Sequence, residues 1–149
     1  MGPLSNKAKY NILSILFIFI VVISWFMNIG WIRVFLAIPM IFHAIIFYFS
    51  NSFYHHNNYK NSKFMKVVNI SFYCTYLLCN ILLPDGGDVG DPVVFFGLIN
   101  NKKLTDAAGI AAGLCLFANV VLMIVQILYT ITIKERLKDE STQNREGAI

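Results

Sequence analysis

The side chains that could do chemistry are few and widely separated in this 149-residue sequence. His43 is the only ionisable residue deep inside an apolar segment, whereas a proton relay needs several acidic or imidazole groups along one path. We therefore interpret His43 as a neutral side chain that is hydrogen-bonded to a neighbouring helix, with a pH-sensing or ligand-contact role as the alternative. His55 and His56 have no cysteine or carboxylate nearby in sequence, so we expect a solvated loop pair and no metal site.

The three cysteines, Cys74, Cys79 and Cys115, do not form a redox motif. Cys74 and Cys79 are five residues apart on one predicted helix, which separates their Cα atoms by more than the ~7 Å that a disulfide spans. In an apolar segment such a thiol behaves as a small hydrophobic group. The sequence also lacks the GxSxG, HExxH, P-loop and GxGxxG patterns. We therefore predict a protein that is not an enzyme and has no cofactor.

One acidic segment deserves comparison with calcium sites. Three carboxylates follow Pro84 at three-residue spacing, with glycines between them, but the EF-hand pattern and its terminal Glu are missing. Because Asp and Gly are also ordinary turn residues, a structural turn is the favoured interpretation. The apolar segment 93–99 that follows is too short to span a membrane, so it dips into the bilayer, covers the bundle or binds a partner. The candidates for recognition in this loop are Asp85, Asp88, Asp91, Phe95 and Phe96.

Composition indicates where these residues must lie. Apolar residues make up 57% of the chain and charged residues 13%, against about 25% charged in an ordinary soluble domain. Asp, Glu, Lys and Arg are absent from four long runs, at 10–32, 34–59, 67–84 and 107–133. This pattern excludes a soluble globular domain, a disordered chain and a disulfide-stapled secreted module. It predicts an all-α integral membrane protein, folded as a four-helix bundle.

A helix needs about 20 apolar residues to cross the hydrocarbon core, so the first apolar stretch must fold back once. The turn is expected at 28–30, where Asn and Gly occur, with Arg33 at a polar surface. Pro84 ends the third span, and Thr105 or Asp106 is the expected N-cap of the fourth. The result is one membrane domain over 1–149, with spans at about 11–28, 32–50, 66–84 and 106–133, an outer loop at 85–105 and a tail at 134–149. The tail is expected to continue the fourth helix before fraying near 141–144.

The positive charges predict the orientation of the two helical hairpins. With the N-terminus in the cytoplasm, nine basic residues lie inside and only Arg33, Lys102 and Lys103 lie outside. Both termini are therefore expected to be cytoplasmic, with a long extracytoplasmic loop between the third and fourth helices. A composition rich in Ile, Phe, Asn and Lys suggests an AT-rich genome, and a bacterial inner membrane is the favoured location. The candidate surface for docking a cytoplasmic partner comprises Lys60, Lys63, Lys66, Lys134, Arg136 and Lys138.

Polar and small residues form stripes on the last two spans. Asn69, Tyr73, Tyr76 and Asn80 share one face of the third, and the fourth carries a stripe of Ala108, Ala112, Asn119, Met123, Gln126 and Thr130. Because amides facing lipid would be unsatisfied, we expect the two stripes to face each other within one bundle. Gly109 and Gly113 form a GxxxG pattern on a different face, which predicts a homo-oligomer, most simply a dimer or tetramer.

These features favour an oligomeric scaffold or sensor in the membrane that docks a cytoplasmic protein, although attraction to anionic lipid would also explain the positive inner charge. In size and number of spans alone, the chain is similar to membrane subunits of bacterial phage-defence systems and to bacteriocin-immunity proteins, and no motif carries that analogy. The alternative is an oligomeric channel or pore lined by Asn119, Gln126 and Thr130.

Overall fold

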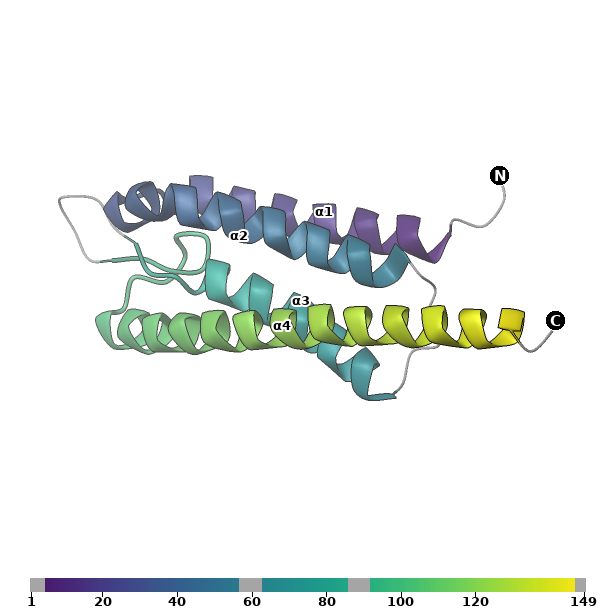
Figure 1. The fold of residues 1–149 in the computed structure, drawn as a ribbon. Helices are drawn as coiled ribbons and strands as arrows, with labels where there is room; N and C mark the ends of the chain where they lie inside the picture. The colour runs from purple at the N-terminus through teal and green to yellow at the C-terminus, as the bar shows by residue number, and fades with distance from the viewer. Residues whose placement is uncertain (1–4, 57–62, 86–91, 147–149) are drawn as a thin grey trace.

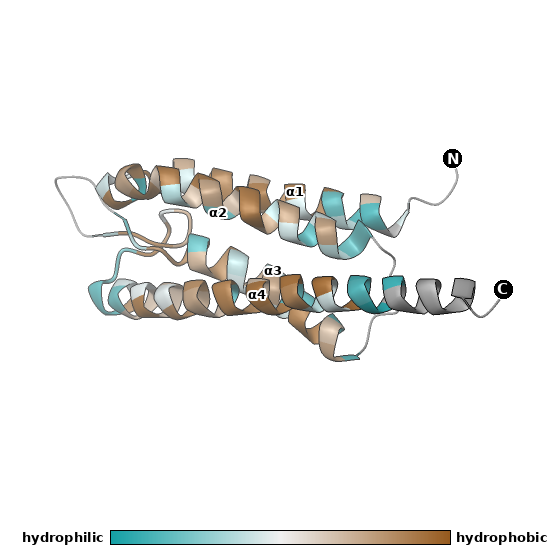
Figure 2. Ribbon diagram, viewed as in Figure 1, coloured by the Kyte–Doolittle hydropathy of each residue, from teal (hydrophilic) through white to brown (hydrophobic). Residues whose placement is uncertain are grey.

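The computed structural model describes residues 5–56, 63–85 and 92–146, and these fold into four α-helices. The helices are α1 (Asn6–Met27), α2 (Trp31–His56), α3 (Lys63–Ile81) and α4 (Lys102–Glu146). The predicted all-α class is confirmed. Each helix is long and apolar enough to cross a membrane, and Figure 2 shows apolar residues along most of their length.

The helices form two hairpins that stack as two layers (Figure 1). α1 packs on α2, and α3 packs on α4; between the layers α1 contacts α3 and α2 contacts α4. α1 is therefore diagonal to α4, and α2 runs in the same direction as α4. Both chain termini lie at one end of the bundle, here called the terminal end. The other end, with the α1–α2 turn and the segment between α3 and α4, is the loop end.

The first hairpin turns where the sequence indicates. Ser5 caps α1 by accepting a hydrogen bond from the Ala8 N–H at 3.3 Å. α1 ends at Met27 and α2 begins at Trp31, so the predicted turn at 28–30 is confirmed. Asn28 follows the last turn and is only 3% exposed, because it is covered by the segment between α3 and α4.

Two predicted ends of the second hairpin are wrong. α3 ends at Ile81 and not at Pro84, because a proline disfavours helical geometry in the residue before it. α4 begins at Lys102, and the Asn101 side chain accepts from the Leu104 N–H at 3.3 Å. Thr105 is therefore inside the first turn and not an N-cap; its hydroxyl donates to the backbone carbonyls of Asn101 and Lys102.

The expected solvated histidine pair is also incorrect, since α2 extends through His56. The His55 ring stacks on Tyr10 of α1, with centroids 3.5 Å apart, and is 6% exposed. Only His56 is exposed, with Nδ1 3.0 Å from Lys7 Nζ. At the other end of the chain, α4 continues out of its apolar part as predicted, but it remains helical through the expected fraying point near 141–144.

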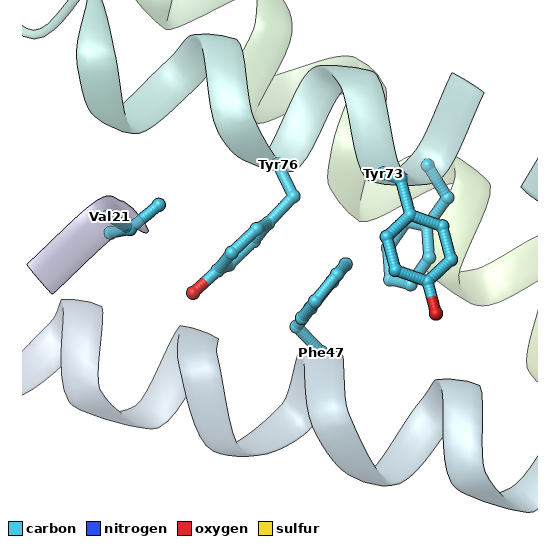
Figure 3. Close-up of a cluster of buried hydrophobic side chains, with 5 residues drawn as sticks. Val21, Phe47, Tyr73 and Tyr76 are labelled. Carbon is cyan, nitrogen blue, oxygen red and sulfur yellow. The ribbon is translucent and has the colours of Figure 1, made fainter. Parts of the chain in front are cut away.

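An aromatic cluster joins the two layers. Val21, Phe47, Phe72, Tyr73 and Tyr76 form this buried core, and Figure 3 shows the ring of Phe47 lying against that of Tyr76. Their centroids are 3.8 Å apart and their planes differ by 9°. The Tyr73 hydroxyl lies 2.8 Å from Ser14 Oγ on α1. α3 is thus held against both helices of the first hairpin.

The two glycines of α4 have different surroundings. A Cβ on Gly109 would lie 3.2 Å from Pro84 Cγ, so this glycine allows close packing within the protomer. A Cβ on Gly113 would have no neighbouring atom within 4 Å. Of the two glycines in the GxxxG pattern, Gly109 therefore packs inside the bundle, and Gly113 lies on the bundle surface without a neighbour.

This difference predicts the effects of two matched substitutions. Gly109→Val should lower the free energy of unfolding by about 1–3 kcal/mol, because the new side chain overpacks the Pro84 contact. Gly113→Val should leave the stability of the protomer unchanged. Thermal unfolding in mild detergent measures both, and equal losses for the two variants would contradict the assignment.

Candidate functional site

The loop end holds a buried arginine, although the sequence suggested a polar surface for it. Arg33 is 0% exposed. Its guanidinium donates to the Ser24 carbonyl at 2.8 Å, near the C-terminus of α1. It also donates to the carbonyls of Asn80 and Leu83 at 3.3 and 2.9 Å, at and just beyond the end of α3. A cation therefore satisfies carbonyls at two helix C-termini, where the helix dipole favours positive charge.

Asp85 completes this cluster from the opposite side. Its carboxylate accepts from the backbone N–H groups of Ile32 at 3.1 Å and Arg33 at 2.6 Å, and so caps the N-terminus of α2. The same carboxylate interacts electrostatically with the Arg33 guanidinium. We call Arg33, Asp85, the carbonyls that Arg33 binds and the N–H groups that Asp85 binds the loop-end clamp. It connects the ends of α1, α2 and α3 to the first residue of the long loop.

The described part of that loop covers the bundle. Asp85 and Val93 exchange two backbone hydrogen bonds, of 3.0 and 2.8 Å. The Asn28 side chain donates to the Val93 carbonyl at 3.2 Å, and Val94 is 1% exposed. The segment 93–99 therefore covers the bundle, which is one of the three alternatives predicted for it. Two phenylalanines form the turn of this cover with positive φ angles, 52° at Phe95 and 59° at Phe96.

A second polar cluster lies in the middle of the bundle and centres on Asn119 of α4. Its amide nitrogen donates to the Phe72 carbonyl and to Thr75 Oγ1 on α3, both at 2.8 Å. Its amide oxygen lies 2.8 Å from His43 Nε2 on α2. The predicted role of His43, a hydrogen bond to a neighbouring helix, is confirmed. Asn119 thus joins α2, α3 and α4 at one level along the bundle.

Gln126 repeats this arrangement two turns further along α4. Its amide nitrogen donates to Asn69 Oδ1 on α3 at 2.9 Å and to Asn51 Oδ1 on α2 at 3.3 Å. Its oxygen accepts from the Ser50 hydroxyl. Since α2 and α4 run in the same direction, the seven-residue spacing from Asn119 to Gln126 matches that from His43 to Ser50. We call the hydrogen bonds around Asn119 and Gln126 the mid-bundle network.

The predicted stripes meet only in part: Asn69 bonds to Gln126, whereas Tyr73 and Tyr76 face the first hairpin, where they contact Ser14 and Phe47. Asn119, Gln126 and Thr130 are 0% exposed, and the Thr130 hydroxyl bonds within its own helix, to the Gln126 carbonyl at 2.7 Å. Ala112 is 2% exposed. Asn80 is also buried, although its side chain bonds within α3, to the Tyr76 carbonyl at 2.7 Å.

The loop and docking candidates are distributed differently. Asp85 is 1% exposed and belongs to the clamp, whereas Phe95 is 43% exposed. Phe96 is half-buried. Asp88, Asp91 and Lys60 lie outside the described residues. The remaining docking candidates are all exposed, at Lys63, Lys66, Lys134, Arg136 and Lys138.

The sequence did not identify Arg33, Ser24 and Ser50 as buried polar groups. One signal was present: Arg33 and Asp85 are opposite charges that flank two apolar runs at the same end of the predicted bundle. An ion pair between Arg33 and Asp85 would have indicated that both side chains are buried in the bundle. The serines gave no signal, because a serine is compatible with either face of a membrane helix.

The clamp pairs one arginine with one aspartate, and the network joins one histidine to amide and hydroxyl groups. Within the described ranges, no group of three or more His, Cys, Asp or Glu side chains is placed to hold a metal ion. The three cysteines are free thiols, with Cys74 exposed and Cys79 buried. What the clamp and the network can do is fix helices relative to one another.

Comparison with known proteins identifies no relative: no protein-family model, no curated protein and no solved structure matches this chain.

Removing the central amide of the network should destabilise the bundle. We expect Asn119→Leu to lower the free energy of unfolding by about 1–2 kcal/mol, because His43 and Thr75 lose their interhelical partner. Val120→Leu, at a 39% exposed neighbouring position, is the control. Unfolding in detergent measures both variants. A double-mutant cycle with His43→Phe should give a coupling energy above zero, and strictly additive losses would refute the bond.

The clamp gives a second, separable effect. Asp85→Ala should lower the free energy of unfolding by about 1–2 kcal/mol, because α2 loses its N-terminal cap. It should also increase hydrogen exchange of the Ile32 and Arg33 amides, which a general loss of stability would not single out. Asp106→Ala, at an exposed acid on α4, is the matched control and should change neither quantity. Unchanged exchange at these two amides in the Asp85 variant would show that the carboxylate does not cap α2.

Proposed function

We propose that this chain is a non-enzymatic membrane protein that acts as an oligomeric scaffold or sensor and docks a cytoplasmic partner. Both termini would lie in the cytoplasm of a cell with the loop end outside, the arrangement favoured by the distribution of basic residues. A bacterial inner membrane suits the composition. A defence or immunity role remains an analogy of architecture alone.

The observation that carries the proposal is the length of α4. It has 45 residues, equivalent to about 68 Å at 1.5 Å per residue, whereas the hydrocarbon core is about 30 Å thick. One uninterrupted helix therefore begins at the loop end and extends well beyond the bilayer at the terminal end. The projecting part includes Lys134, Arg136 and Lys138, all exposed, which makes it a suitable surface for a protein partner.

The loop end supports a detecting role. The long loop begins at Asp85, whose carboxylate binds the N-terminus of α2, and it returns over Asn28 at the end of α1. A ligand that moved this loop would therefore act directly on helix ends. Phe95 and Leu98, 43% and 75% exposed, provide apolar contact surface on the same cover.

The open glycine supports self-association. Gly113 lies among exposed apolar residues of α4, including Ile110, Leu114 and Phe117, and a Cβ there would meet nothing within 4 Å. A second protomer could approach this face closely. Dimers or tetramers are the simplest symmetric assemblies.

The pore alternative receives less support. It requires Asn119, Gln126 and Thr130 to face water, but all three are 0% exposed and are hydrogen-bonded inside one protomer. Opening a pore along them would break the mid-bundle network. The same residues thus favour a rigid support over a conduction path.

Charge reversal of the projecting helix tests the docking proposal. A triple variant should lower the affinity for a cytoplasmic partner by about tenfold or more, because the partner would meet negative charge in place of positive charge. Its substitutions are Lys134→Glu, Arg136→Glu and Lys138→Glu. The partner is first identified by cross-linking through α4 and then titrated against the purified membrane protein.

Lys102→Glu with Lys103→Glu, at the other end of α4, is the matched control and should leave that affinity unchanged. Native mass spectrometry of the same samples reports the number of copies. Equal partner binding by both variants would overturn the docking proposal, and a single protomer mass would overturn the oligomer.

A further inference from the structure

A groove between α1 and α3 opens at the terminal end of the bundle, away from the loop-end clamp, and shares Asn69 with the mid-bundle network. It has a volume of about 390 Å³. Tyr10, Leu13 and Phe17 line it from α1, and Lys66, Ile70 and Cys74 line it from α3. Both helices begin at the terminal end and run in the same direction (Figure 1).

The groove changes in polarity along its length. Lys66 is at its mouth and is exposed, with Tyr10 half-buried across from it. Deeper along the helices the lining is mostly apolar, with Leu13, Phe17 and Ile70. Asn69 and Tyr73 also line it, but the Asn69 amide oxygen and the Tyr73 hydroxyl are hydrogen-bonded to Gln126 and Ser14. From Lys66 to Cys74 is eight residues, or about 12 Å of helix, a depth that an extended acyl chain covers with about ten methylene groups.

The mouth of the groove favours negative charge. α1 and α3 both begin at this end, and neither has an acidic residue in its first turn. Helix N-termini attract anions through their dipoles. Lys9 and Lys63 are exposed nearby on the same two helices, and Lys66 forms no ion pair with any acidic side chain in the part of the chain that the structure describes.

We infer that this groove binds one anionic phospholipid. Its phosphate would lie at Lys66 and Tyr10, and one acyl chain would follow Leu13, Phe17 and Ile70 toward Cys74. A second copy of the chain fits less well, because a two-fold interface would bring the same lysines from both copies together. This inference rests on the proposed membrane insertion and does not depend on the docking of a cytoplasmic partner.

Native mass spectrometry in mild detergent tests the headgroup. With phosphatidylglycerol and phosphatidylcholine of equal chain length as probes, we expect a preference for phosphatidylglycerol. Lys66→Gln should reduce its affinity about fivefold, and Lys66→Arg should retain it. Lys134→Gln, at an exposed lysine of α4 and away from the groove, is the matched control. Equal binding of both lipids, or an equal loss in the Lys134 variant, would overturn the proposal.

The thiol of Cys74 tests the location. In a Cys115→Ser background the exposed Cys74 reacts with a maleimide, while Cys79 is 3% exposed and protected. Added phosphatidylglycerol should slow this reaction, phosphatidylcholine should not, and Lys66→Gln should raise the phosphatidylglycerol concentration needed for protection about fivefold. Unchanged reactivity with phosphatidylglycerol bound, or cross-linking of Cys74 between two copies, would overturn the proposed site.

The two proposals fail separately. A chain that does not co-sediment with vesicles of equimolar phosphatidylcholine and phosphatidylglycerol would refute membrane insertion itself, and with it this site. A chain that inserts but binds both lipids equally would refute only the lipid site.

Discussion

A polar group inside an apolar bundle is costly unless it is hydrogen-bonded, and this constraint explains the two polar clusters of the molecule. At the loop end, a single arginine donates to three carbonyls at or near the ends of α1 and α3, while Asp85 accepts from two N–H groups of α2. The unsatisfied ends of three helices are thus combined in one buried cluster. Water or lipid could not replace these bonds with the same geometry, so the helices are fixed relative to one another by their own termini.

The same rule operates in the middle of the bundle. Asn119 and Gln126 each contact both α2 and α3, because α4 lies beside both of these helices. An amide has both a donor and an acceptor, which allows one side chain to bridge two neighbours. Aromatic packing of Phe47 on Tyr76 joins α2 directly to α3. The polar residues of these two clusters therefore hold helices together, and the surfaces outside them include the cover, the exposed α4 face and the terminal end.

Much of this was readable from particular residues. The charge-free runs gave four helices, and the spacing of Asn69, Asn119 and Gln126 gave the contact between α3 and α4, because amides cannot be left facing lipid. Asn28 and Gly30 marked the first turn. Helix ends were less predictable: α4 begins at Lys102 because Asn101 caps it, and Thr105 looked equally suitable. α2 continues to His56, with His55 stacked on a tyrosine 45 positions earlier in the chain, which no local pattern encodes.

The sequence by itself determined the all-α class, the number of apolar helices and the faces that carry polar groups, since hydrophobicity and helical periodicity are local properties. Only the tertiary structure decided that α1 lies diagonal to α4, that Arg33 is buried against Asp85 and that Gly109 packs on Pro84 while Gly113 stays open. Each of these depends on which helices become neighbours. That choice is a property of long-range packing, in which distant residues must satisfy one another's charges, hydrogen bonds and volumes at the same time.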